Sequence, residues 1–250
     1  MRVWFFHAGF SRRGLIGVLL CFALGCVVGV FHGGVNASLA LSSWQQAKAW
    51  LLEGKVIVLD PGHGGIDPGA WSREHKILEK DIVLDIALIT RDYLRAAGAS
   101  VILTRETDTD LVEGAFESLK ERSRIDLYKR AEIVAKVRPD AFLSIHANSF
   151  PSSIWYGAQT FYYKGGHPAS KRLAELLQEE LARQTQNTTR KASDRIDQYV
   201  LRVSEAPSAT VEVGFLSNPR EAELLSRRGF RERIAWSIFT ALARFFAENP

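Results

Sequence analysis

Two histidines stand where they could bind a metal ion together. His63 follows the apolar run Lys55–Leu59 within a glycine-rich turn, and His146 directly follows the apolar run Ala141–Ile145. In α/β sheets, loops at the carboxyl ends of the strands aim side chains at one crevice. Two neutral imidazoles from separate strand ends are therefore a candidate metal pair. Each histidine taken alone is more often a hydrogen-bonded structural residue.

Two carboxylates could complete such a site. Glu79 lies near the start of an expected helix, from which it could reach the same crevice as a third ligand, although a helix N-terminus also favours an acid there for its dipole. Glu212 interrupts the apolar run Ala209–Phe215, where an unpaired charge would cost several kcal/mol. Catalytic proton transfer would explain Glu212, and so would a buried ion pair, for example with Arg105.

The elements that would carry these side chains alternate between strands and helices. Apolar, β-branched runs predict strands over residues 55–59, 100–104, 141–145, 158–163, 199–203 and 209–213. Helical spacing of apolar residues predicts helices over residues 77–97, 119–137, 168–185, 219–226 and 230–246. This alternation predicts an α/β fold in which a sheet lies between helical layers.

The N-terminus is apolar and basic. Gly14–Phe31 contains no charged residue and follows Arg12 and Arg13. Residues 1–37 are therefore expected to be a signal peptide cleaved after Ala37, or an uncleaved membrane anchor. Either one delivers the rest of the chain outside the cytoplasm, secreted or membrane-anchored. Residues 38–54 then form a linker, and residues 55–250 form a single catalytic domain.

Composition excludes several functions for this domain. The two cysteines of the chain, Cys21 and Cys26, both lie in the leader. For the domain this excludes a disulfide scaffold, a cysteine-ligated zinc finger and a cysteine nucleophile. Beyond the leader the chain carries 29 basic and 28 acidic residues of the totals of 32 and 28, so nucleic acid is not an expected partner. The turn Gly62–Gly65 lacks the Lys-Ser/Thr ending of a phosphate-binding loop.

Five segments in a fixed order carry a resemblance to a known family: Val58–Ala70, Glu79–Asp81, Leu103–Arg105, Ser144–Asn148 and Val211–Asn218. Over about residues 55–247 the chain resembles the zinc-dependent N-acetylmuramoyl-L-alanine amidases of the amidase_3 type. Two further segments, Glu121–Arg130 and Asn148–Phe161, are most similar to the germination-specific branch, which serves spore-cortex formation.

The resemblance implies a three-layer α/β/α sandwich with a mostly parallel or mixed central sheet. It also implies Zn²⁺ held by the equivalents of His63, Glu79 and His146, and catalysis by the equivalent of Glu212. Arg105 and Asn148, at neighbouring strand ends, are candidates for orienting the substrate or the metal ligands. A carboxylate partner and a turn-forming amide are their alternative roles.

A reaction and partners follow from the resemblance. A zinc-activated water would cleave the amide between the lactyl group of N-acetylmuramic acid and L-alanine of the peptidoglycan stem peptide, with Glu212 moving the protons. The expected partners are the peptidoglycan substrate, an accessory lipoprotein and, in the same process, a muramic-acid deacetylase. We expect a monomer.

Two other functions remain open from the sequence. The domain could be a wall-binding or partner-binding module that has kept the fold without turnover. It could instead be a zinc peptidase that cuts within the stem peptide and leaves alanine on the muramic acid.

Overall fold

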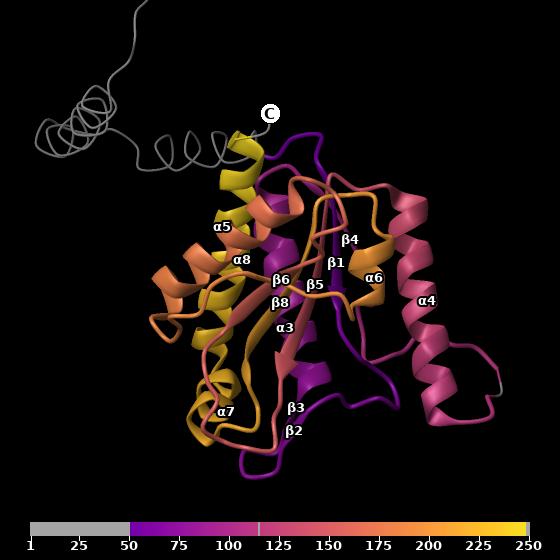
Figure 1. Ribbon diagram of the computed structural model, residues 1–250, viewed down its shortest axis with the longest axis vertical. Helices are drawn as coiled ribbons and strands as arrows, with labels where there is room; N and C mark the ends of the chain where they lie inside the picture. The colour runs from indigo at the N-terminus through magenta and orange to yellow at the C-terminus, as the bar shows by residue number, and fades with distance from the viewer. Residues whose placement is uncertain (1–50, 115, 249–250) are drawn as a thin grey trace, which may run out of the picture. The chain divides into compact units, whose positions relative to one another are not determined.

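Residues 51–114 and 116–248 are described by a computed structural model built around one six-stranded sheet (Figure 1). The strand order is β4-β1-β5-β8-β6-β7, with bounds β1 Val56–Pro61, β4 Ser100–Leu103, β5 Ala141–Asn148, β6 Gln159–Tyr162, β7 Ser193–Asp194 and β8 Ser208–Phe215. The first four strands in this order are parallel, whereas β6 runs antiparallel to β8. A short hairpin, β2 Trp71–Ser72 and β3 Ile77–Leu78, lies apart from this sheet.

Helices cover both faces of the sheet. Their bounds are α3 Glu79–Ala96, α4 Leu119–Val137, α5 Ser170–Thr185, α6 Tyr199–Val203, α7 Pro219–Ser226 and α8 Arg228–Glu248. Figure 1 shows α4 and α6 on one side of the sheet, and α3, α5 and α8 on the other. The predicted three-layer α/β/α sandwich with a mostly parallel sheet is thereby confirmed.

Alternating strand residues explain why both faces need cover. Ile57 and Leu59 of β1 are buried in the larger apolar cluster with α3, α5 and α8, whereas Val58 between them packs with α4 and α6. Every residue of β8 is buried. The continuous apolar runs in the sequence therefore mark strands that are covered twice, as parallel strands are.

One predicted element is wrong. Residues 199–203 were expected to form a strand, but they form helix α6. The strand β8 already pairs with β5 on one edge and with β6 on the other, so no sheet position beside it is free. The adjacent residues Val200 and Leu201 instead pack together in the cluster beneath α4, which a helical turn permits and an alternating strand does not.

The predicted leader, residues 1–37, and residues 38–50 of the predicted linker lie outside the described residues. None of the helices in residues 51–114 and 116–248 combines the length and apolar character needed to cross a membrane.

Candidate active site

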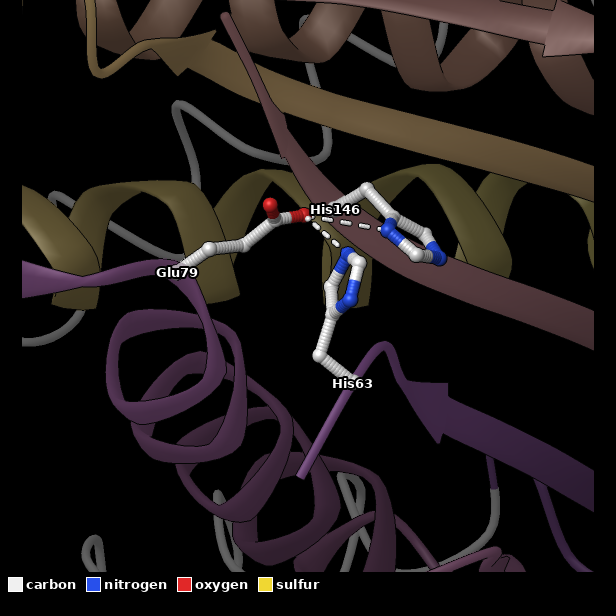
Figure 2. A group of neighbouring side chains, drawn as sticks. All are labelled: His63, Glu79 and His146. Atoms are coloured by element: carbon white, nitrogen blue, oxygen red, sulfur yellow. Dashed lines mark hydrogen bonds and ion pairs between the residues drawn. The ribbon is translucent and has the colours of Figure 1, made fainter. Parts of the chain in front are cut away.

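The three predicted metal ligands lie together near the carboxyl ends of β1 and β5, with His146 inside β5. Oε1 of Glu79 is 3.2 Å from Nε2 of His63 and 3.0 Å from Nδ1 of His146, and both nitrogens face the carboxylate (Figure 2). One donor atom from each residue lies within 4.8 Å of the other two. Segments distant in the sequence thus converge on a point where one cation could replace the hydrogen bonds.

Two glycines make room for these ligands. A Cβ on Gly62 would lie 2.1 Å from Cε1 of His146, and a Cβ on Gly69 would lie 2.6 Å from Oε2 of Glu79 and 2.7 Å from Cδ2 of His63. No larger residue fits at either position without displacing a ligand side chain. The backbone is therefore shaped around the three ligands, and the set of two imidazoles and one carboxylate is a donor set that zinc accepts.

The backbone that carries His63 is held from two sides. His63 has φ 59°, the left-handed region that non-glycine residues seldom adopt. Arg105 donates to the carbonyls of Pro61 and Gly62, at 3.0 and 2.9 Å. From α4, Arg130 donates to the carbonyls of Pro61 and His63, at 2.8 and 2.6 Å. These bonds hold the turn in a conformation that would otherwise cost roughly 1–3 kcal/mol.

The arginine from α4 belongs to a buried network. Nη1 of Arg130 lies 2.6 Å from Oδ1 of Asp60, and its Nε lies 2.6 Å from Oδ2 of Asp126. Thr104 and Ser144 donate to the two oxygens of Asp60. Burial raises the pKa of Asp60, but Arg130 and the two hydroxyls outweigh it and hold that pKa below its usual range. Asp60 thus stays ionised at the end of β1 and anchors the turn.

Asp67 is a candidate site residue that the sequence did not reveal. Its Oδ2 lies 2.9 Å from Nδ1 of His63, on the side of the ring opposite the cluster. A carboxylate in this position fixes the tautomer in which Nε2 is free to bind a metal. The only available signal was an aspartate four residues after a candidate histidine, which is too common a spacing to be informative.

The charge distribution of the His63, Glu79 and His146 cluster favours cation binding. Burial lowers the pKa of His63, but its hydrogen bonds with Asp67 and Glu79 outweigh burial and raise that pKa to about 10. Burial raises the pKa of Glu79, yet hydrogen bonds from His146 and His63 bring it well below its usual range. Oε1 of Glu79 also accepts the Ala147 N–H at 2.9 Å. The carboxylate of Glu79 is therefore ionised, and a bound cation would take the place of the protons in its hydrogen bonds with the two histidines.

Glu212 lies beside the cluster on β8. It is the register partner of His146 on β5, and both side chains line one cavity. Its Oε2 is buried and has no hydrogen-bond partner in the described part of the chain. Burial raises the pKa of Glu212, and the charge of Glu79 adds to this, although His146 opposes it. A carboxyl of this kind can both accept and return a proton.

The cavity next to the cluster has a volume of about 290 Å³. Its lining includes His63, His146 and Glu212, residues of α4, and residues from 195–201, which overlap the start of α6. The cavity therefore gives access to the two candidate histidine ligands and to Glu212.

Two other predicted site residues, Arg105 and Asn148, form hydrogen bonds within the protein. Arg105 is buried and also donates to the carbonyls of Thr107 and Lys80, so it organises the backbone around the turn. The suggested ion pair of Arg105 with Glu212 is wrong, because Glu212 lies instead 4.0 Å from Arg195. Oδ1 of Asn148 accepts the N–H of Ser149, as a turn-forming amide does.

The glycine-rich turn does not present its N–H groups to a phosphate. The N–H groups of Gly62, Gly64 and Gly65 donate to the Ile145 carbonyl, the Asp67 carbonyl and Oδ1 of Asp108 respectively. This turn is therefore closed by the protein itself, in agreement with the tight-turn interpretation.

Comparison with known proteins gives consistent relatives. A family model described as N-acetylmuramoyl-L-alanine amidase, Amidase_3, matches residues 57–244. The chain is 43% identical over 209 residues to the germination-specific N-acetylmuramoyl-L-alanine amidase of Bacillus subtilis (strain 168), which covers 83% of this chain and 86% of that protein. It is 35% identical over 196 residues to the B. subtilis amidase LytC, covering 77% of this chain but 36% of LytC.

Solved structures agree with the sequence relatives. The CwlD amidase from Clostridioides difficile, in complex with the GerS lipoprotein, aligns with a TM-score of 0.75 and 40% identity, covering 78% of this chain and all (100%) of that chain. The catalytic domain of CwlV from Bacillus (Paenibacillus) polymyxa aligns with a TM-score of 0.67 and 31% identity, covering 77% of this chain and 98% of that chain. By sequence, fold and the family model together, the chain belongs to the N-acetylmuramoyl-L-alanine amidase family.

Proposed function

We propose that the chain hydrolyses the amide between the lactyl group of N-acetylmuramic acid and L-alanine of the stem peptide in spore-cortex peptidoglycan. One observation carries this proposal: His63 and His146 of the cluster line a cavity together with Glu212, whose buried Oε2 has no hydrogen-bond partner in residues 51–114 and 116–248. The match to a germination-specific amidase supports the substrate.

We assign Nε2 of His63, Oε1 of Glu79 and Nδ1 of His146 as the zinc ligands. Bound zinc would polarise the scissile carbonyl and lower the pKa of water. Asp67 orients His63, and the N–H groups of Ala147 and Ala70 hold the two oxygens of Glu79 at 2.9 and 2.7 Å. With the ligand geometry fixed before binding, little reorganisation is required of the protein.

Glu212 performs the proton transfers in this proposal. Its carboxyl group accepts a proton from the attacking water and then donates that proton to the nitrogen of the departing L-alanine. The apolar burial that raises the pKa of Glu212 brings the carboxyl closer to the neutral range, where it can perform both steps.

The test uses the full chain, loaded with zinc and incubated with purified spore cortex, with a chelated sample in parallel. Mass spectrometry should find stem peptides that begin with L-alanine, together with peptide-free muramic acid, and neither product with chelator. Products that retain alanine on the muramic acid would identify a peptidase instead. Binding to cortex without any product would identify a non-catalytic module.

We propose that an accessory lipoprotein binds the loop after β5. The solved CwlD amidase is in complex with the GerS lipoprotein, which supports such a partner. The loop exposes four large apolar side chains, namely Phe150, Ile154, Trp155 and Tyr156, and the guanidinium of Arg190 lies 5.7 Å from the ring centre of Trp155. Tryptophan, tyrosine and arginine are the residues on which interface affinity commonly depends.

A pair of tryptophan variants tests this surface. Trp155→Ser should weaken binding of the purified lipoprotein at least about tenfold, since a central aromatic contributes roughly 2 kcal/mol or more. Trp71→Ser removes an equally exposed tryptophan from β2 and should leave the affinity unchanged. Equal affinities for all three proteins would remove this loop from the interface.

Delivery and the following reaction belong to the same proposal. The leader, residues 1–37, places the domain outside the cytoplasm, so the envelope-associated protein should begin at residue 38 if cleaved, or at Met1 if anchored. Hydrolysis frees the lactyl carboxyl that lactam formation requires, so a muramic-acid deacetylase should yield muramic lactam from the cleaved glycan and none from intact glycan. Recovery of the protein from the cytosol, or lactam from uncleaved strands, contradicts the respective step.

A further inference from the structure

Two arginines line the cavity, and they differ in how their donors are used. Arg130 is 3% exposed, and each of its three guanidinium nitrogens donates to a protein oxygen. Arg195 is about one-third exposed, and its Nη1 donates no hydrogen bond to any residue in the described ranges. Arg195 is therefore the cavity arginine that has a donor left for a ligand.

The other groups of Arg195, apart from Nη1, are held by contacts with the protein. Its Nε and Nη2 donate to the two carboxylate oxygens of Asp197, at 2.8 and 2.6 Å. The guanidinium carbon of Arg195 lies 5.0 Å from the ring centre of Phe161, and the backbone N–H of Arg195 donates to the carbonyl of Tyr162. The planar group is thus oriented before any substrate arrives, which reduces the entropy lost on binding.

The nitrogen of Arg195 that donates no hydrogen bond lies near Glu212, the proposed proton-transfer residue. Nη1 of Arg195 lies 4.0 Å from Oε1 of Glu212. A general base works within about 2.6–3.2 Å of the proton that it transfers, which places Nη1 within about 7 Å of the scissile amide. One residue of extended chain spans about 3.3–3.6 Å, so two residues span about 7 Å. A distance of about 7 Å from the scissile amide therefore corresponds to a group carried by the residue after L-alanine.

We propose, on the basis of the proposed function, that Arg195 binds the free carboxylate carried by the stem-peptide residue that follows L-alanine. In a stem peptide that continues through the γ-carboxyl of D-glutamate, the α-carboxylate of this residue remains free and anionic. A guanidinium with one uncommitted donor matches this group, and Asp197 balances the charge of the arginine when no substrate is present. Arg195 thereby selects for an anionic second residue.

The experiment compares two soluble muropeptides that differ only in whether this α-carboxylate is free or amidated. Full-length zinc-loaded wild type, Arg195→Gln and Arg195→Lys are assayed for kcat and KM on both. Arg227→Gln is the matched control, because it removes one exposed arginine that pairs with Glu223 on another part of the surface.

The wild type should favour the carboxylate substrate by about ten- to hundredfold in kcat/KM. This ratio corresponds to the free energy that a hydrogen bond to a charged group usually contributes. Arg195→Gln should lose that preference through a higher KM for the carboxylate substrate, with the amidated substrate changed less than about threefold. Arg195→Lys should retain part of the preference. Arg227→Gln should match the wild type on both substrates.

Two results overturn this inference. An equal loss on both substrates, with the preference unchanged, means that Arg195 acts only through Glu212. Equal binding of the product peptide and its α-amide to the wild type, measured by calorimetry, means that no carboxylate site exists. The calorimetry needs no turnover, so a wild type that binds the product selectively but cleaves neither substrate refutes the proposed function while the carboxylate site stands.

Discussion

His146 and Glu212 face each other across adjacent parallel strands, as register partners on β5 and β8. One belongs to the candidate metal cluster, and the other carries the carboxylate oxygen that has no hydrogen-bond partner among the described residues. The backbone hydrogen bonds of the sheet therefore fix the distance between metal binding and proton transfer. The two functions should nevertheless be separable by substitution, because Glu212 is not part of the ligand trio.

Glu212→Gln should retain zinc and lose roughly two to four orders of magnitude in kcat, the usual value of a general acid–base group. His63→Ala should lose the metal itself. Metal content after dialysis, measured by elemental mass spectrometry, is compared with turnover for both proteins. Similar zinc loss in the two variants would contradict the assignment of Glu212 to proton transfer.

Asp67→Asn should weaken zinc binding by about ten- to hundredfold, because the amide no longer fixes the ring of His63 as an anion does. Competition with a chelator of known affinity measures the change. Asp92→Asn removes an exposed carboxylate that pairs with Arg91, and it serves as the control for loss of one negative charge. Wild-type affinity in Asp67→Asn would show that the carboxylate does not support the site.

Gly62→Ala should abolish metal binding, because the added methyl group would lie 2.1 Å from the ring of His146. Overpacking of this kind also lowers the free energy of unfolding by about 1–3 kcal/mol. Gly229→Ala meets nothing within 4 Å and lies in α8, so it should leave metal binding intact and raise stability by up to about 1 kcal/mol. Thermal melts and metal analysis of the two alanine variants test this contrast.

Glu180 should contribute to acid denaturation. Burial raises its pKa, but hydrogen bonds from Arg183, Arg244 and Thr240 outweigh burial and lower that pKa below the unfolded value of 4.5. Its stabilisation is therefore complete above about pH 5 and is lost as the pH falls through the lower, folded-state pKa. Urea unfolding across this range should show wild type and Glu180→Gln furthest apart near neutral pH and converging in acid.

Glu223→Gln is the control for the pH series, because Glu223 is exposed and pairs only with Arg227 in the described ranges. Its free energy of unfolding should run nearly parallel to that of the wild type. A difference between wild type and Glu180→Gln that is constant with pH would mean that the ionised form of Glu180 has no special stabilisation.

The layered fold was predictable because its strands are covered on both faces. A continuous apolar run such as Ile57–Leu59 would leave apolar side chains in water unless helices packed on both sides of the sheet. The run at 199–203 is also mostly apolar and β-prone but forms α6, since the edges of β8 are already paired. Composition alone does not reveal which sheet edges are occupied, because that depends on the pairing of distant segments.

The site was predictable to the extent that topology delivers it. Parallel strands bring His63 and His146 to one edge of the sheet. Glu79 was a candidate from its position near a helix start, and the family resemblance assigned it as a ligand. Asp67 and Arg195 could not be identified in advance, since their roles depend on where a turn and a cavity wall fold back. Arg105 was assigned to the correct region, but its donors serve backbone carbonyls.

The order of the site residues along the chain has a consequence for biosynthesis. The three candidate ligands occur by residue 146, whereas Glu212 lies on β8, and the cavity wall with Arg195 also comes after the ligands. Chains are made from the N-terminus, so a nascent or truncated polypeptide can contain every metal ligand and still lack the group that moves the proton. We therefore expect a chain that ends before β8 to contain the three candidate metal ligands and yet not to hydrolyse peptidoglycan.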